Sequence, residues 1–131
     1  MHHFDLLRRG IMECCKIIRG YYLTGLGQEE LAYYFKVTEE QFEDLNLKVG
    51  DIMITFYQNQ EVITSIPALV RVASLITDKT IVTQYLNSEK IDGFPMLPIV
   101  EKYKNFDPIV FKHIMEMYQN MKEEITQLKL K

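Results

Sequence analysis

Residues 26–45, LGQEELAYYFKVTEEQFEDL, constrain the fold more than any other stretch of this chain. Their apolar residues recur at helical spacing in two groups: Leu31, Ala32 and Phe35, then Phe42 and Leu45. Thr38 followed three residues later by Gln41 is a capping-box pattern, which predicts that the second helix begins there. Val37 falls in the turn between the groups, so the spacing predicts a helix-turn-helix.

Three positions of this stretch carry a family pattern: Gln28, Ala32 and Val37. On these residues the stretch resembles the helix-turn-helix of the lambda-repressor and Cro family, although Lys36 stands where the turn of that family usually carries glycine. The resemblance implies a DNA-binding regulator of transcription. Small size and this fold are associated with phages and mobile elements.

The second predicted helix carries acid at its exposed positions: Glu39, Glu40, Glu43 and Asp44. Residues 37–65 hold one basic and six acidic side chains, a local charge of −5 in a chain of net charge −3. DNA readers present Arg, Lys, Asn and Gln, and their affinity depends on cations near phosphates. The acid therefore disfavours DNA and predicts a protein partner with a basic surface. The alternative is a solvated helix face whose acids favour the helix N-terminus.

Four basic residues lie on the helix that we expect over residues 4–23: Arg8, Arg9, Lys16 and Arg19. They are candidates for phosphate contacts, and the alternative is a solubilising face. Cys14 and Cys15 are adjacent, which disfavours a disulfide between them and fits a reducing cytoplasm.

The remaining chain is also expected to be mainly helical. Residues 52–66 are ambiguous between helix, which we favour, and a small β-hairpin. Ser65 with Pro67 predicts a helix start, and Asp78 predicts the next one. Asp107 followed by Pro108 predicts the N-cap of a long C-terminal helix over 107–129. We therefore expect one all-α domain over residues 1–131, composed of several helices.

The C-terminal helix carries an apolar seam with steps of three and four residues: Phe111, Ile114, Tyr118, Met121, Ile125 and Leu128. This spacing is typical of coiled coils and predicts a homodimer interface. The alternative is packing of the seam into the protein's own core, which Val110 and Met117 favour for the first half of the helix.

No acid–histidine–nucleophile spacing, metal-ligand pattern or glycine-rich phosphate loop occurs, so we expect no enzyme activity, cofactor or metal. No apolar run is long enough to span a membrane. The sequence thus predicts a non-enzymatic regulator that acts mainly through protein contacts. The alternatives are a Cro-like DNA-binding regulator and a homo-oligomeric scaffold protein.

Overall fold

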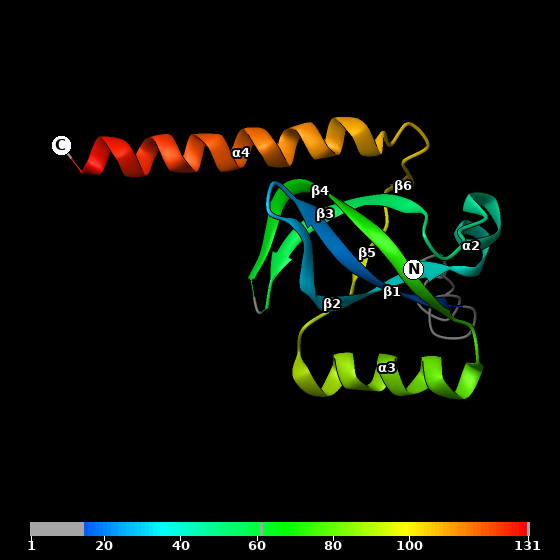
Figure 1. The fold of residues 1–131 in the computed structure, drawn as a ribbon. Helices are drawn as coiled ribbons and strands as arrows, with labels where there is room; N and C mark the ends of the chain where they lie inside the picture. Colours follow the sequence, from blue (N-terminus) through cyan, green and yellow to red (C-terminus); the bar gives the residue numbers. More distant parts are fainter. Residues whose placement is uncertain (1–14, 61, 131) are drawn as a thin grey trace.

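The computed structural model describes residues 15–60 and 62–130. Four long strands form most of one sheet, and they are arranged as two antiparallel hairpins that lie side by side (Figure 1). The first hairpin joins β1 to β2, the second joins β3 to β4, and β1 pairs antiparallel with β4. The strands are Cys15–Thr24 (β1), Gly27–Thr38 (β2), Ile52–Asn59 (β3) and Val62–Ile76 (β4).

Two short strands, β5 (Leu97–Pro98) and β6 (Glu101–Lys102), belong to one stretch of chain but lie at opposite ends of the strand order β5-β2-β1-β4-β3-β6. β5 pairs parallel with β2, and β6 pairs antiparallel with β3. Between them, the backbone N–H of Val100 donates to the carbonyl of Ile54 at 2.8 Å. Residues 97–102, the closing segment, therefore join both edges of the sheet, which curls into a half-barrel.

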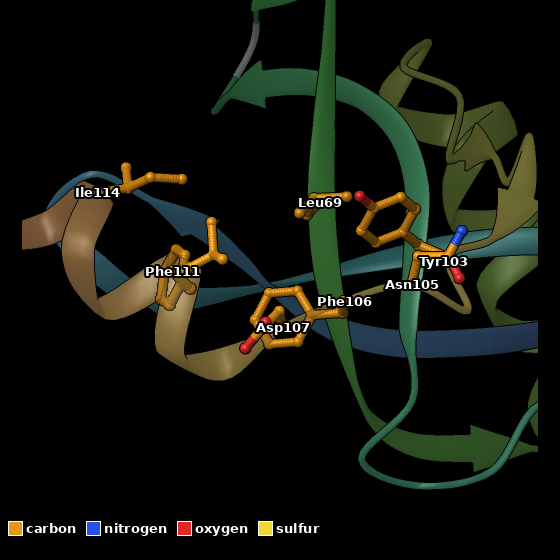
Figure 2. Close-up of a pocket in the computed structure, with 8 residues that line it drawn as sticks. Leu69, Tyr103, Asn105, Phe106, Asp107, Phe111 and Ile114 are labelled. Atoms are coloured by element: carbon orange, nitrogen blue, oxygen red, sulfur yellow. The ribbon is translucent and has the colours of Figure 1, made fainter.

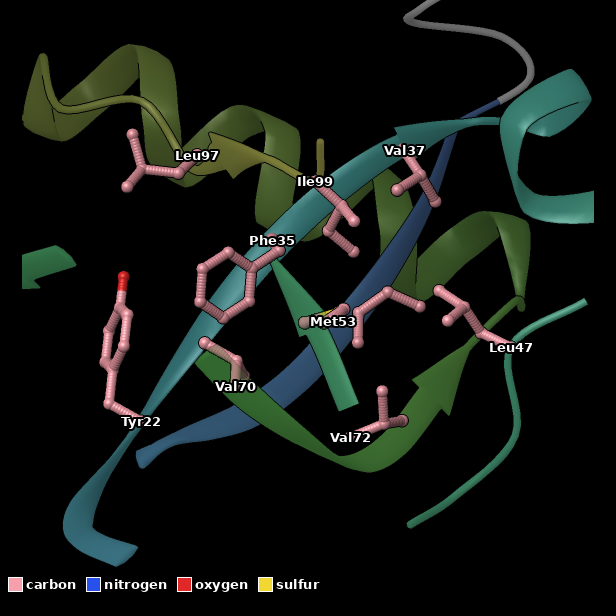
Figure 3. Close-up of a cluster of buried hydrophobic side chains, with 10 residues drawn as sticks. Tyr22, Phe35, Val37, Leu47, Met53, Val70, Val72, Leu97 and Ile99 are labelled. Carbon is pink, nitrogen blue, oxygen red and sulfur yellow. The ribbon is translucent and has the colours of Figure 1, made fainter. Parts of the chain in front are cut away.

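The main core fills the inside of this half-barrel. Successive side chains of a strand point to opposite faces of a sheet, so alternate side chains of each long strand point into this core. Its fully buried members include Tyr22, Phe35, Met53, Val70 and Val72, one or two from each long strand (Figure 3). Tyr22 also has its polar end satisfied, since its hydroxyl donates to the carbonyl of Phe56 at 2.6 Å.

Three helices are described: α2 (Glu39–Leu45), α3 (Lys79–Asp92) and α4 (Pro108–Lys129). α3 covers part of the outer face of the sheet, where its Val82 and Leu86 pack with Ile17 of β1. An ion pair also holds α3, because Lys36 Nζ lies 2.7 and 2.9 Å from the two carboxylate oxygens of Glu89. Within residues 15–60 and 62–130, no helix combines the length and the apolar character that a bilayer crossing requires.

The prediction of an all-α fold with a helix-turn-helix is wrong. Residues 27–38 form β2 in place of the first helix of that motif. Phe35 and Val37 point into the core at alternate positions, whereas Leu31, which the helical pattern placed inside, is 52% exposed. Aromatic and β-branched residues favour strands, and here their alternation prevails over the helical spacing. Because Lys36 lies within a strand, the chain needs no glycine at that position.

Two further helix predictions are wrong. Residues 15–23, the described part of the helix predicted over 4–23, form most of β1, and the helix predicted from Ser65 to Ile76 is part of β4. The rest of the first predicted helix lies outside the described residues. For residues 52–66 the hairpin alternative is confirmed and helix is wrong, and the hairpin is longer than expected because β4 runs on to Ile76.

The predictions of helix starts at Thr38, Asp78 and Asp107 are confirmed, whereas the start predicted at Ser65 is not. The Thr38 side chain accepts from Gln41 N at 3.1 Å and begins α2. Asp78 and Asp107 likewise accept backbone hydrogen bonds at the starts of α3 and α4. Capping signals are local, because the side chain and the backbone groups that it satisfies lie within three residues of each other.

Candidate protein interface

α4 begins beside the half-barrel and then runs past it (Figure 1). The carboxylate of its N-cap Asp107 accepts from Ile109 N at 2.9 Å, and Pro108 occupies the first turn. Within the described chain none of its 22 residues is buried. Three are half-buried on one side of the helix: Phe111, Met115 and Tyr118. Of these, Met115 and Tyr118 rest near the turn between β1 and β2. The helix is therefore supported by the half-barrel only along its first half.

A second side of α4 is apolar and exposed. It consists of six side chains with exposed fractions from 46% to 71%, here named the α4 stripe: Val110, Ile114, Met117, Met121, Ile125 and Leu128. These residues cover 18 positions in five steps, a mean of 3.6, which equals the helical repeat. The stripe therefore runs straight along the helix. Successive residues of a helix are rotated by about 100° around its axis. By this rotation the stripe lies roughly a quarter of a turn around α4 from the side that rests on the half-barrel.

The stripe begins in a groove between α4 and the sheet. This groove has a volume of about 390 Å³, and Leu69 of β4, Tyr103 and Phe106 line it together with the first turns of α4 (Figure 2). The ring centres of Phe106 and Phe111, which both line the groove, lie 5.7 Å apart. Val110 and Ile114 belong to both the groove and the stripe, so the two form one continuous apolar surface.

Charged side chains border the α4 stripe on both sides, and the two borders differ in sign. At about 100° per residue, Lys122 and Lys129 follow the border nearer the half-barrel, and Glu124 lies on the opposite border. All three are exposed, and none forms an ion pair with another residue of the described chain.

The structure divides the seam predicted from the sequence. Phe111 and Tyr118 turn towards the half-barrel, while four of its members are exposed together: Ile114, Met121, Ile125 and Leu128. Val110 and Met117 are exposed on the same side as these four, whereas the sequence pattern predicts that they pack into the protein's own core. The mean spacing of 3.6 was the available signal for this set, because a seam on a straight helix follows the helical repeat.

The four acidic residues predicted to bind a partner lie on α2. Glu40, Glu43 and Asp44 are exposed, whereas Glu39 is half-buried with Oε1 3.7 Å from Nζ of Lys16. α2 has only seven residues, and it follows a strand, so this face is not the second helix of a helix-turn-helix. A role in partner binding stays a prediction.

The basic residues predicted to contact phosphate are not brought together on a helix. Arg8 and Arg9 lie outside the described residues. Lys16 and Arg19 lie on β1, three positions apart, so their side chains leave opposite faces of the sheet. Lys16 contacts Glu39, while the Nη2 atom of Arg19 donates to the hydroxyl of Tyr21 at 2.7 Å.

Over the residues that the structure describes, no three His, Cys, Asp or Glu side chains are grouped to hold a metal ion. Comparison of the chain with protein-family models, curated proteins and solved structures gave no match. The α4 stripe and its groove are therefore interpreted from their own geometry and chemistry.

Proposed function

We propose that this protein is a non-enzymatic interaction protein that forms a parallel homodimer through α4. The observation that carries the proposal is the α4 stripe, six apolar side chains in line on a helix of which no residue is buried by the described chain. Contiguous exposed apolar surface on a protein marks a site of interaction. The buried thiol of Cys15 fits a reducing compartment, and we place the protein in the cytoplasm.

A second copy of the chain fits the stripe because its borders are complementary to themselves. In a parallel helix pair, opposite borders of the two helices meet, so Glu124 of one copy faces Lys129 of the other, five positions on. In an antiparallel pair, like borders meet and the lysines face lysines. The charges therefore favour a parallel homodimer over an antiparallel one.

The half-barrels leave room for this pairing. The stripe lies roughly a quarter of a turn from the side of α4 that carries Phe111, Met115 and Tyr118. A two-fold axis parallel to the helices therefore places the two half-barrels on opposite sides of the helix pair. The contacts that support α4 within one chain are kept when the dimer forms.

Cysteine cross-linking tests the parallel arrangement. Leu128→Cys places two thiols opposite each other in a parallel pair, so mild oxidation should give a covalent dimer on a non-reducing gel. Glu116→Cys, on the other side of α4, is the matched control and should give no more covalent dimer than the wild-type chain gives. Equal cross-linking of the two variants, or none for Leu128→Cys in a sample that sediments as a dimer, would contradict the parallel arrangement.

The acidic face of α2 supports a second binding function for each protomer. Glu40, Glu43 and Asp44 are exposed and form no ion pair with a described residue, so they are available to a partner with a basic surface. Neutralising all three to Gln, Gln and Asn should abolish capture of such a partner. The control neutralises Glu101, Glu116 and Glu123, three exposed acids elsewhere. Equal capture by both triple variants would show that the α2 acids are not used.

A further inference from the structure

The outer face of the sheet carries a second group of polar side chains, on β1 and β4 between the parts covered by α3 and α4. Arg19 of β1 pairs with Ser74 of β4, and Tyr21 pairs with Arg71. Directly paired residues of an antiparallel ladder share one face. Ile17, two positions before Arg19, packs beneath α3 on the outer face, so these four side chains also belong to that face.

The two arginines lie diagonally across the β1–β4 pair, and both have hydrogen-bonding capacity to spare. The Nε atom of Arg71 is buried and has no hydrogen-bond partner in the described chain. Arg19 donates to the Tyr21 hydroxyl, and its guanidinium lies 5.1 Å from the centre of the Tyr21 ring. Neither arginine forms an ion pair with a described carboxylate. Two arginines that form no ion pair with a described residue therefore lie on one face of the β1–β4 pair.

We infer that Arg19, Tyr21, Arg71 and Ser74 bind a single phosphate group, as a phosphate monoester presents it. Guanidinium groups bind phosphate oxygens through paired hydrogen bonds, and two of them match the charge of a phosphate dianion. One carboxylate, with a single charge, would leave half of this positive charge uncompensated. Ser74 pairs with Arg19 across the β1–β4 ladder, and its hydroxyl supplies a further donor.

A long nucleic-acid strand fits these observations less well. Affinity for such strands rises with the number of phosphates that cations neutralise, and this area supplies two arginines in a chain of net charge −3. We therefore assign the site to one phosphate group on a small molecule. The inference goes beyond the proposed dimer and does not depend on it, because none of the four residues belongs to the α4 stripe or lines its groove.

Isothermal titration with adenosine 5′-monophosphate, inorganic phosphate and adenosine tests the assignment. We expect the first two probes to bind with similar affinity and adenosine not to bind. Arg71→Lys keeps the charge but loses the planar fork, and Arg19→Gln loses the charge, so each should weaken binding about tenfold or more. Lys90→Gln, an exposed cation on α3, is the control and should bind as the wild-type chain does.

Thermal melting of each variant separates loss of the site from loss of the fold. If Arg71→Lys unfolds, the Arg19→Gln result alone decides, since Arg19 is half-exposed. Absence of phosphate binding by the wild-type chain, or unchanged binding by a folded Arg19→Gln variant, would overturn the inference. Tighter binding of an unphosphorylated oligothymidylate than of adenosine 5′-monophosphate would also overturn it, in favour of a nucleic-acid strand.

Discussion

Replacing Ile125 by lysine tests whether the α4 stripe is an intermolecular surface. Ile125 is 46% exposed, so a dimer would bury the remaining half of a side chain whose full burial contributes about 1.5–3 kcal/mol. The loss is therefore about 1 kcal/mol for each copy, or about 2 kcal/mol for the dimer. At about 1.4 kcal/mol for each tenfold change, the dimer dissociation constant should rise roughly 30-fold. Two ammonium groups facing each other in the seam weaken the dimer further.

Sedimentation velocity over a range of micromolar concentrations measures this change. Thr126→Lys is the matched control, because it adds the same charge at the next position but on another side of α4. It should leave the dissociation constant within about twofold of the wild-type value, as surface changes usually do. At concentrations low enough for all three proteins to be monomeric, both variants should melt as the wild-type chain does.

Two results would refute the reasoning. If Ile125→Lys sediments as the wild-type chain does at every concentration, the stripe is not the dimer interface. If it lowers the melting temperature of a chain that is monomeric throughout, Ile125 stabilises the protomer itself. A fall in mass without a change in protomer melting is the expected outcome.

Three further predictions concern the half-barrel. Gly20→Ala should lower the free energy of unfolding by about 1–3 kcal/mol in a urea titration, because the added Cβ would lie 2.9 Å from the carbonyl oxygen of Arg71; an unchanged urea midpoint would contradict this close approach. The hydrogen bond to Glu29 raises the pKa of Tyr57 to about 12, and burial raises the pKa of Tyr22 to about 12. Since an unfolded tyrosine ionises near pH 10, the contribution of these two tyrosines to stability should be constant up to that pH and be lost between pH 10 and pH 12; chemical denaturation of the wild-type chain and of a Tyr57→Phe variant at each pH measures this, and equal pH profiles of the two proteins above pH 10 would disagree. Glu89→Gln removes the carboxylate that contacts Lys36 and accepts from Met96 N at 2.6 Å, so it should speed hydrogen exchange in α3 more than in β3; equal exchange rates in α3 of both proteins would argue against this anchoring role.

The sequence predicts the helix starts of this fold better than its strands. Thr38, Asp78 and Asp107 act on backbone groups two or three residues away, so local pattern is sufficient for them. The strands match a helical pattern because a spacing of four residues fits both the helical repeat and the alternation of a strand. Ile18 and Tyr22 are four apart, one helical turn or two strand alternations, and both point into the core of the half-barrel.

The candidate interface was predictable only in part. Ile114, Met121, Ile125 and Leu128 follow from helical periodicity within one element. The groove could not be predicted, because Leu69 reaches α4 only through the pairing of β4 with β1 and β3. Its formation depends on residues that are distant in the sequence and carry no local signal.

The closing segment also has a consequence for the order in which a new chain acquires its properties. Leu97 pairs with Phe35, which is 62 positions earlier, and contacts so distant in the sequence form late in folding. Until they form, the edges of β2 at Phe35–Lys36 and of β3 at Met53–Ile54 are unpaired, and unpaired edges promote aggregation with other chains. α4 lies after the closing segment in the sequence, so the ribosome synthesises residues 97–102 before it synthesises the α4 stripe. The proposed dimerisation through α4 is thereby restricted to chains that already contain residues 97–102, which close the half-barrel.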